Sequence, residues 1–297
     1  MHKDEFQHSI AKFILRNFVD RQGLWICKKN TGVEHKSYSI NKPSNPVLFG
    51  KINFYGHKKI IDITNEKNIA SNSNDSVETF LGKDIEHKIA PIFKKIIYTP
   101  NLKLNDYEIE QIRKYVFIQH TRTPKFKKDM ELFYQSDIYK EIEESVKNKY
   151  GKQFQNTIFN ALNKKFLSDN HTLFIVDDKI FKDFYNITEM NKTNLYVLVR
   201  TAPNYFVLPD SGVMCVELIE TERIWYLPIS PIICLCLSKL PENKLPKYSQ
   251  NDFNELVWLE AMEEIYSNSK NKLEEIYNKF KNKKEIFSFL DGTKKFE

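Results

Sequence analysis

The sequence of 297 residues predicts an α+β fold, on two observations. Apolar residues recur at helical spacing in a helical block of about residues 76–170, and again in C-terminal helices of about 251–290. Between them, in about residues 171–237, short segments rich in β-branched and aromatic residues are separated by Pro, Gly, Asp and Asn. Because the strands form one block and do not alternate with helices, we expect the helical block to pack on a mainly antiparallel sheet.

A short amphipathic helix is predicted within residues 7–18, at the start of the chain. Ser9 is its candidate N-cap, since a hydroxyl can accept a hydrogen bond from a backbone N–H of the first turn. One helix face carries the apolar residues Ile10, Phe13 and Ile14 together with the polar Asn17. After this helix we expect a strand over 24–29, a polar loop over 30–46 and a strand-like stretch over 47–56.

Two helices are predicted at the start of the helical block. The first follows the polar run 69–76, with Asp75 or Ser76 as its cap, and extends to about residue 96. The second starts at NDYEIE, where Asn105 is the expected N-cap and Glu108 the third residue of a capping box. That helix is expected to end at TRTP (121–124), because a proline disfavours helical geometry in the residue before it.

The strands of the predicted sheet are 171–178, 194–202, 204–210, 213–220, 223–230 and 232–237. A linker with two prolines follows at 239–247. A helix is then predicted from Asn251 or Asp252 to about Tyr266, and a last helical segment from about 270 to 290. No flexible linker separates the helical block from the sheet, so we expect a single domain over residues 1–297.

Charge and cysteine usage restrict the classes of protein that the chain can belong to. The net charge of +6 is compatible with an anionic partner such as nucleic acid but does not require one. The four cysteines match no zinc-site spacing and are expected to be small core residues in a reducing, cytoplasmic location: Cys27, Cys215, Cys234 and Cys236. No stretch reaches the roughly 20 apolar residues that a membrane-spanning helix needs, so no membrane association is expected.

Common catalytic signatures are absent from the sequence: GxGxxG, GxxxxGK[ST], HExxH and GxSxG. Two polar residues nevertheless stand in restricted backbone positions. Arg122 precedes Pro124 at a helix end, and a guanidinium fixed there either grips a phosphate or carboxylate or braces the helical block. Asp210 lies in LPDSGV between two apolar strands, where it either bonds its own turn or acts as a positioned acid.

Several short segments, taken in order, resemble the family known as domain of unknown function 4238. The family pattern is a start of the type H-Y-V-P-x-F-Y-L-R-x-F, then F-Y, a helix with a glutamate, R-T-P, S-D-x-P-V and P-L-S-P. The matching segments run from His8 to about Tyr266 and are HSIAKFILRNF (8–18), NFY (53–55), DIEHKIAPIFKKI (84–96), RTP (122–124), LPDSGV (208–213) and LPISP (227–231). Ala11, Pro209 and Gly212 depart from the pattern without removing a polar position. The resemblance implies no agreed activity, but it singles out His8, Arg16, Glu86, Arg122 and Asp210.

These five residues suggest an enzyme that acts on phosphate esters, similar to a nuclease, and the resemblance associates it with microbial defence or toxin systems. His8 would be the general acid or base, with Glu86 and Asp210 as further catalytic residues that orient it or hold a divalent metal such as Mg²⁺. Arg16 and Arg122 would neutralise the charge of the substrate phosphate. The expected partner is RNA or DNA, attracted by the basic, lysine-rich helices.

The alternative is a non-enzymatic binding or sensor module. In that hypothesis the same residues form a structural network that joins the first helix, the helical block and the sheet, since buried arginine–acid pairs need no substrate. The two hypotheses differ in whether the polar side chains are accessible or fully engaged inside the protein.

Overall fold

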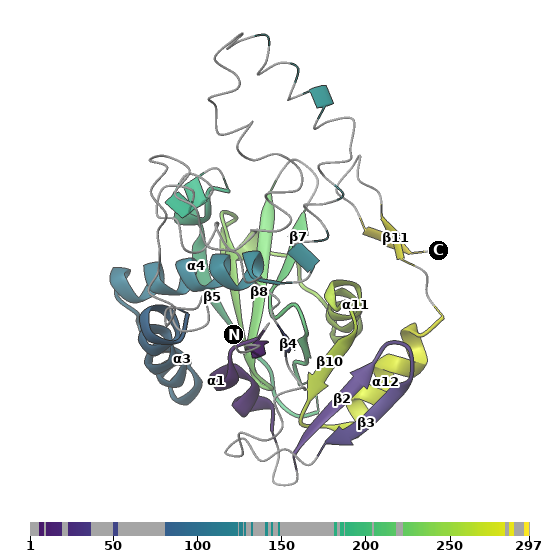
Figure 1. The fold of residues 1–297 in the computed structure, drawn as a ribbon. Coiled ribbons are helices and arrows are strands. Elements are labelled where there is room, and N and C mark those ends of the chain that lie inside the picture. The colour runs from purple at the N-terminus through teal and green to yellow at the C-terminus, as the bar shows by residue number, and fades with distance from the viewer. Residues whose placement is uncertain are drawn as a thin grey trace, which may run out of the picture.

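In a computed structural model, the chain forms two four-stranded antiparallel sheets with helices packed around them (Figure 1). The predicted α+β class is confirmed. The structure describes residues 6–8, 10–19, 23–36, 50–52, 81–123, 188–203, 205–217, 222–282, 285–287 and 294–296, together with isolated residues between 125 and 186. The predicted strand 171–178 lies outside the described residues.

The central sheet has the strand order β5-β9-β8-β7, in which every neighbouring pair is antiparallel. The strands are β5 (Asn194–Val199), β7 (Met214–Glu217), β8 (Arg223–Ser230) and β9 (Ile233–Ser238). Apart from the exposed Arg223, every residue of β8 and β9 is buried. Continuous burial of this kind requires packed elements on both faces of the sheet, since successive side chains point to opposite faces.

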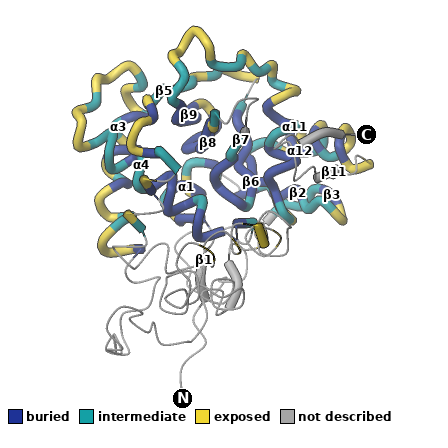
Figure 2. Tube along the Cα trace, turned by 90° about the horizontal axis from the view of Figure 1, so that it is seen from above, coloured by how far each residue is buried: buried dark blue, intermediate teal, exposed yellow. Residues whose placement is uncertain are grey.

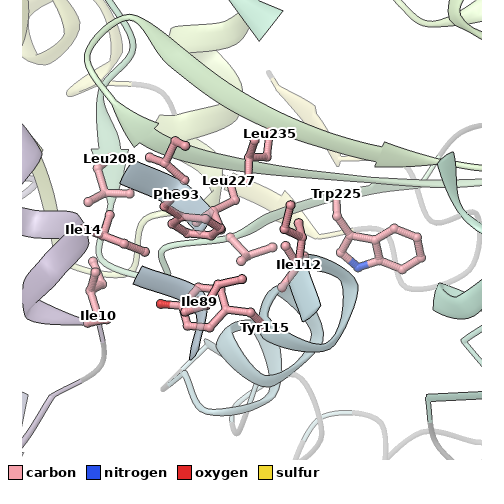
Figure 3. Close-up of a cluster of buried hydrophobic side chains, with 14 of the residues drawn as sticks. Ile10, Ile14, Ile89, Phe93, Ile112, Tyr115, Leu208, Trp225, Leu227 and Leu235 are labelled. Carbon is pink, nitrogen blue, oxygen red and sulfur yellow. The ribbon is translucent and has the colours of Figure 1, made fainter. Parts of the chain in front are cut away.

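One face of the central sheet packs against three helices. They are α1 (Lys12–Leu15), α3 (His87–Tyr98) and α4 (Asp106–Thr121). Figure 3 shows the sheet residues Trp225, Leu227 and Leu235 above the apolar faces of α3 and α4. The helices contribute the buried side chains Ile14, Ile89, Phe93, Ile112 and Tyr115. This core confirms the predicted packing of the helical block on the sheet.

The other face of the central sheet forms a second core with α11 (Gln250–Glu260) and α12 (Lys270–Phe280). Tyr226 of β8 meets Phe253 of α11 with ring centroids 5.8 Å apart. Cys234 and Cys236 both lie in this core, because strand residues two apart share a face. Cys27, Cys234 and Cys236 are buried, and burial raises the pKa of the Cys236 thiol to about 12. These three are core residues, as predicted, whereas Cys215 is only partly buried.

The second sheet corrects three predictions. Its order is β3-β2-β10-β6, with β2 (Leu24–Lys28), β3 (Gly32–Lys36), β6 (Leu208–Pro209) and β10 (Glu264–Ser267). The predicted loop 30–46 contains β3, which a tight turn joins to β2. The predicted strand 204–210 is reduced to β6 and pairs with this sheet. The predicted helix to Tyr266 ends at Glu260, because residues 264–267 gain strand partners on both sides in β2 and β6.

The helix starts agree with the capping prediction in α4 and differ from it in α1. Asn105 and Glu108 form the predicted capping box, with hydrogen bonds of 2.8 and 3.0 Å. Helix α11 has a second box, from Ser249 and Asp252. The predicted cap Ser9 lies outside the described residues, and α1 starts later, after Ala11, whose side chain makes no cap hydrogen bond.

The remaining elements are short. A π-helical turn, η3 (Leu81–Glu86), leads into α3, so the predicted first helix of the block is described from Leu81 onward. β1 (Phe6–His8) pairs with β4 (Gly50–Ile52). A helix to about residue 290 was predicted, but α12 ends at Phe280. Residues Glu285–Phe287 form β11 instead, which pairs with β12 (Lys294–Phe296). In the described part of the chain, 3₁₀ turns are formed by η1 (Arg16–Phe18), η5 (Met190–Lys192) and η6 (Glu242–Lys244).

Candidate functional site: a buried polar network

Arg122 forms an ion pair with Glu86 between two helices. Arg122 is the C-cap of α4, where its backbone N–H donates to the carbonyl of Ile118 over 3.0 Å. Its Nη1 donates to Glu86 Oε1, also over 3.0 Å. The arginine is 1% exposed and the Glu86 side chain 23% exposed. Since Glu86 ends η3, directly before α3, the pair ties the start of α3 to the end of α4.

The two threonines around Arg122 fix the backbone of this helix end. Thr121 Oγ1 donates to the carbonyl of Ile118 over 3.2 Å. Thr123 Oγ1 donates to the carbonyl of His120 over 3.0 Å and accepts from the N–H of Phe126 over 3.2 Å. Thr121 thus adds a second donor to the carbonyl that already accepts from the Arg122 N–H, and Thr123 links two further backbone groups at the helix end. The TRTP motif therefore holds Arg122 in one orientation through local hydrogen bonds.

Asp210 accepts hydrogen bonds from three consecutive backbone amides. Its Oδ1 accepts from Met262 over 2.8 Å, and its Oδ2 accepts from Glu263 over 2.8 Å and from Glu264 over 3.1 Å. Its own N–H donates to the carbonyl of Glu264 over 3.0 Å. The turn after β6 is thereby joined to the connection between α11 and β10. Both carboxylate oxygens of Asp210 are engaged in holding backbone.

Lys29 completes the same connection from the other side. Its Nζ donates to the carbonyls of Trp258 and Ala261, each over 2.9 Å, and lies 5.2 Å from the centroid of the Trp258 ring. These carbonyls belong to the last turn of α11 and its C-cap, where a cation is favoured by the helix dipole. The polar residue at the end of β2 is thus a helix-capping group that the sequence analysis did not single out.

Gln119 links the helix of Arg122 to the turn of Asp210. Gln119 is fully buried in α4, and its Nε2 donates to the carbonyl of Ser211 over 3.4 Å. Gly212, with φ +72°, approaches so closely that a Cβ there would lie 2.7 Å from Gln119 Nε2. The RTP and LPDSGV motifs, far apart in sequence, therefore meet along the last turn of α4. In the sequence, Gln119 could have been recognised as a polar residue that directly follows three apolar ones, Val116–Ile118.

Lys125 and Glu260 extend the network to the end of α11. Lys125 Nζ lies 3.8 Å from Glu260 Oε2, and the side chains are 14% and 4% exposed. Glu260 is the last residue of α11, where the helix dipole disfavours a carboxylate, so a nearby cation offsets an unfavourable position. Through this pair, the segment after Arg122 contacts the same helix that Lys29 and Asp210 brace.

No described contact joins His8 or Arg16, the two candidates from the first motif, to this network. The backbone of His8 pairs with Gly50 in the β1–β4 ladder, and its side chain lies outside what the structure describes. Arg16 is exposed on η1. The polar residue of this motif with a structural contact is Asn17, whose Nδ2 donates to the carbonyl of Ile229 over 2.8 Å. That bond lies at the β-bulge between Pro228 and Ser230 of β8.

Burial is the largest influence on the pKa values of Asp210 and Tyr266. Burial raises the pKa of the Asp210 carboxyl, although its three backbone N–H donors act in the opposite direction. Tyr266 donates to Glu264 Oε2 over 2.8 Å, and burial, followed by the nearby carboxylates of Glu264 and Asp210, raises its pKa well above the usual value. Among the described residues, no group of three or more His, Cys, Asp or Glu side chains is arranged to hold a metal ion.

Fold and network together define an α+β protein in which buried polar side chains tie the helical layer to the second sheet. The chain belongs to the family described as protein of unknown function (DUF4238), whose model matches residues 7–271, nearly the whole chain. The resemblance noted in the sequence is therefore confirmed. No curated protein and no solved structure matches the chain significantly. No helix in the part of the chain described is long and apolar enough to cross a membrane.

Proposed function

We propose that the chain is a non-enzymatic binding module for an anionic partner, with nucleic acid as the ligand class, and that its polar network is a structural frame. The observation that carries the proposal is the state of Asp210, whose two carboxylate oxygens already accept three backbone hydrogen bonds. A carboxylate engaged in this way holds the backbone of residues 262–264 in place, which is the role expected of a structural residue.

The burial of Arg122 supports the same proposal. At 1% exposure, its guanidinium can reach a phosphate only after the surrounding residues move. A buried arginine needs a carboxylate partner in any case, and Glu86 supplies it. The net charge of +6 favours an anionic partner, and four free, mostly buried cysteines suit a reducing, cytoplasmic location.

A second candidate is a nuclease-like hydrolase of a microbial defence or toxin system. It is favoured by Glu86, whose side chain is 23% exposed while its partner Arg122 is fixed. In such an enzyme Glu86 would act as the acid or base, Arg122 would stabilise negative charge, and His8 would be the further proton-transfer group. Arg16, exposed on η1, would bind the substrate at the periphery.

A cleavage assay separates the two functions. Purified wild type, Glu86→Gln and Asp84→Asn are incubated with labelled single-stranded and duplex RNA and DNA, with Mg²⁺, with Mn²⁺ and with chelator. Asp84 is an exposed carboxylate in the same turn as Glu86 and serves as the matched control. The binding module predicts intact substrate in every reaction. Cleavage by the wild type that a folded Glu86→Gln loses and Asp84→Asn keeps would establish the hydrolase instead.

A further inference from the structure

The outer face of α3 is basic. Residues 87–98, HKIAPIFKKIIY, contain three lysines and a histidine and no acidic residue. The apolar side chains at 89, 92, 93 and 96 face the core. His87, Lys94 and Tyr98 lie on the opposite side of the helix and Lys88 lies on its flank, all four exposed. Figure 2 shows exposed residues in yellow around α3. The acidic Asp84 is exposed in the turn before the helix.

The C-terminal end of α3 adds exposed aromatic rings to this charge. Tyr98, the last residue of α3, is 76% exposed, and Tyr107, in the first turn of α4, is 62% exposed. Leu102, between them, is 40% exposed. Side chains exposed to this degree contribute little to the core and are accessible to a ligand.

The corner between α3 and α4 is held by specific bonds. Lys95 Nζ donates to Glu108 Oε1 over 2.7 Å, so the last turn of α3 is tied to the first turn of α4. The capping box of Asn105 and Glu108 fixes the start of α4 next to Tyr107. Tyr98 lies one helical turn after Lys95, and Tyr107 directly precedes Glu108. These bonds therefore hold the backbone that carries both rings.

We propose that the outer face of α3, with Tyr98 and Tyr107, binds single-stranded nucleic acid. Lysine side chains such as Lys88 and Lys94 would contact the phosphates, and the tyrosine rings would stack on bases. Helix α3 has 12 residues and is therefore about 18 Å long. At the roughly 3.4 Å rise per nucleotide of a stacked strand, it spans about five phosphates.

The exposed tyrosine rings favour a single strand over a duplex as the ligand. A duplex presents phosphates to lysines equally well, but its base faces are covered by stacking, so exposed tyrosines gain nothing from it. The inference rests on the proposed binding function and names its ligand and its surface.

Fluorescence anisotropy tests this surface. The probes are labelled single-stranded oligonucleotides of about 15 nucleotides, as DNA and RNA, and a duplex of the same length. Tyr98→Ala is expected to weaken single-strand binding at least about 5-fold, and Tyr98→Phe to retain it, because stacking needs the ring and not the hydroxyl. The double reversal Lys88→Glu/Lys94→Glu is expected to reduce the slope of log affinity against log salt by about 1.4, because each phosphate contact on a single strand contributes about 0.7.

Lys244→Glu/Lys247→Glu is the matched control, because it reverses two exposed lysines in η6 and the following loop. This control is expected to change the salt slope less than the Lys88→Glu/Lys94→Glu variant does. The proposal is overturned if the wild type binds no single strand, if it prefers the duplex, or if the α3 and control variants weaken binding equally. Cleavage of the probe by the wild type would refute the non-enzymatic function alone, since loss of binding in Tyr98→Ala would still identify the α3 surface.

Discussion

Lys29 and Asp210 hold one connection from opposite sides. The ammonium of Lys29 caps two carbonyls at the end of α11, and the carboxylate of Asp210 accepts from the three amides that follow. Around the connection from the end of the helix at Glu260 to the start of β10 at Glu264, these two side chains therefore supply partners for five backbone groups. This arrangement explains why a residue that looks catalytic in the sequence is engaged inside the fold.

Gly212→Ala is expected to destabilise the protein, whereas Gly82→Ala is not. At Gly212 the left-handed φ of +72° and the approach of Gln119 Nε2 to 2.7 Å both oppose a side chain. Backbone strain of this kind costs about 1–3 kcal/mol. At Gly82 nothing lies within 4 Å of an added Cβ. Urea unfolding of both variants checks the difference, and equal midpoints for the two would refute the packing described for the Asp210 turn.

Asn17→Ala is expected to lower the free energy of unfolding by about 1–2 kcal/mol, because it leaves the buried carbonyl of Ile229 without its 2.8 Å donor. The neighbouring Arg16→Ala is the control and should change stability by less than about 0.5 kcal/mol, since Arg16 is exposed. Chemical denaturation of both variants provides the measurement. A larger loss in Arg16→Ala would show that the wrong residue of the motif had been assigned the structural contact.

Local chemistry made some of these features predictable from the sequence. The capping box was predicted because Asn105 and Glu108 are only three positions apart, and each side chain bonds the backbone N–H of the other residue. Strands β8 and β9 were predicted because burial on both faces leaves an unbroken apolar run. The family pattern also identified Arg122 and Glu86, which form a direct pair.

Features that depend on distant partners were not predictable in the same way. Residues 264–267 have a sequence compatible with a helix and form a strand because β2 and β6 pair with both edges. Lys29 and Gln119 have functions in the network that arise from contacts more than 90 residues away along the chain. The three amides of residues 262–264 that donate to Asp210 could not be foreseen from the sequence, because only folding brings them to this residue. For this reason Asp210 could be mistaken for a catalytic acid.

The Arg122–Glu86 pair is expected to show a coupling free energy of about 1–3 kcal/mol in a double-mutant cycle. Arg122→Ala alone should destabilise by about 3 kcal/mol, the lower end of the range for buried pairs, because the 23% exposed Glu86 retains some solvation once its partner is gone. Urea unfolding of both single variants and the double variant gives the coupling. Strictly additive effects would mean that the two side chains do not interact in solution.

Glu189 predicts a local pH dependence of stability. Its carboxylate accepts from Lys192 over 2.6 Å and from Lys239 over 2.8 Å, and these bonds lower its pKa from 4.5 to about 2. Because the folded state releases this proton more readily than the unfolded state, the stabilisation is present above about pH 4.5 and is lost as the pH falls toward 2. The difference in stability between wild type and Glu189→Gln should therefore shrink across this window. A difference that stays constant from pH 6 to pH 2 would contradict the assignment.

Hydrogen exchange at the amides of residues 262–264 tests the central claim most directly, because these are the groups that Asp210 is inferred to hold. The structural frame predicts slow exchange there in the wild type, although Glu263 is exposed. In Asp210→Ala the same amides should exchange fast while those of β8 and β9 stay protected. Fast exchange at residues 262–264 in the wild type would contradict the account, because it would leave the carboxylate of Asp210 free for chemistry.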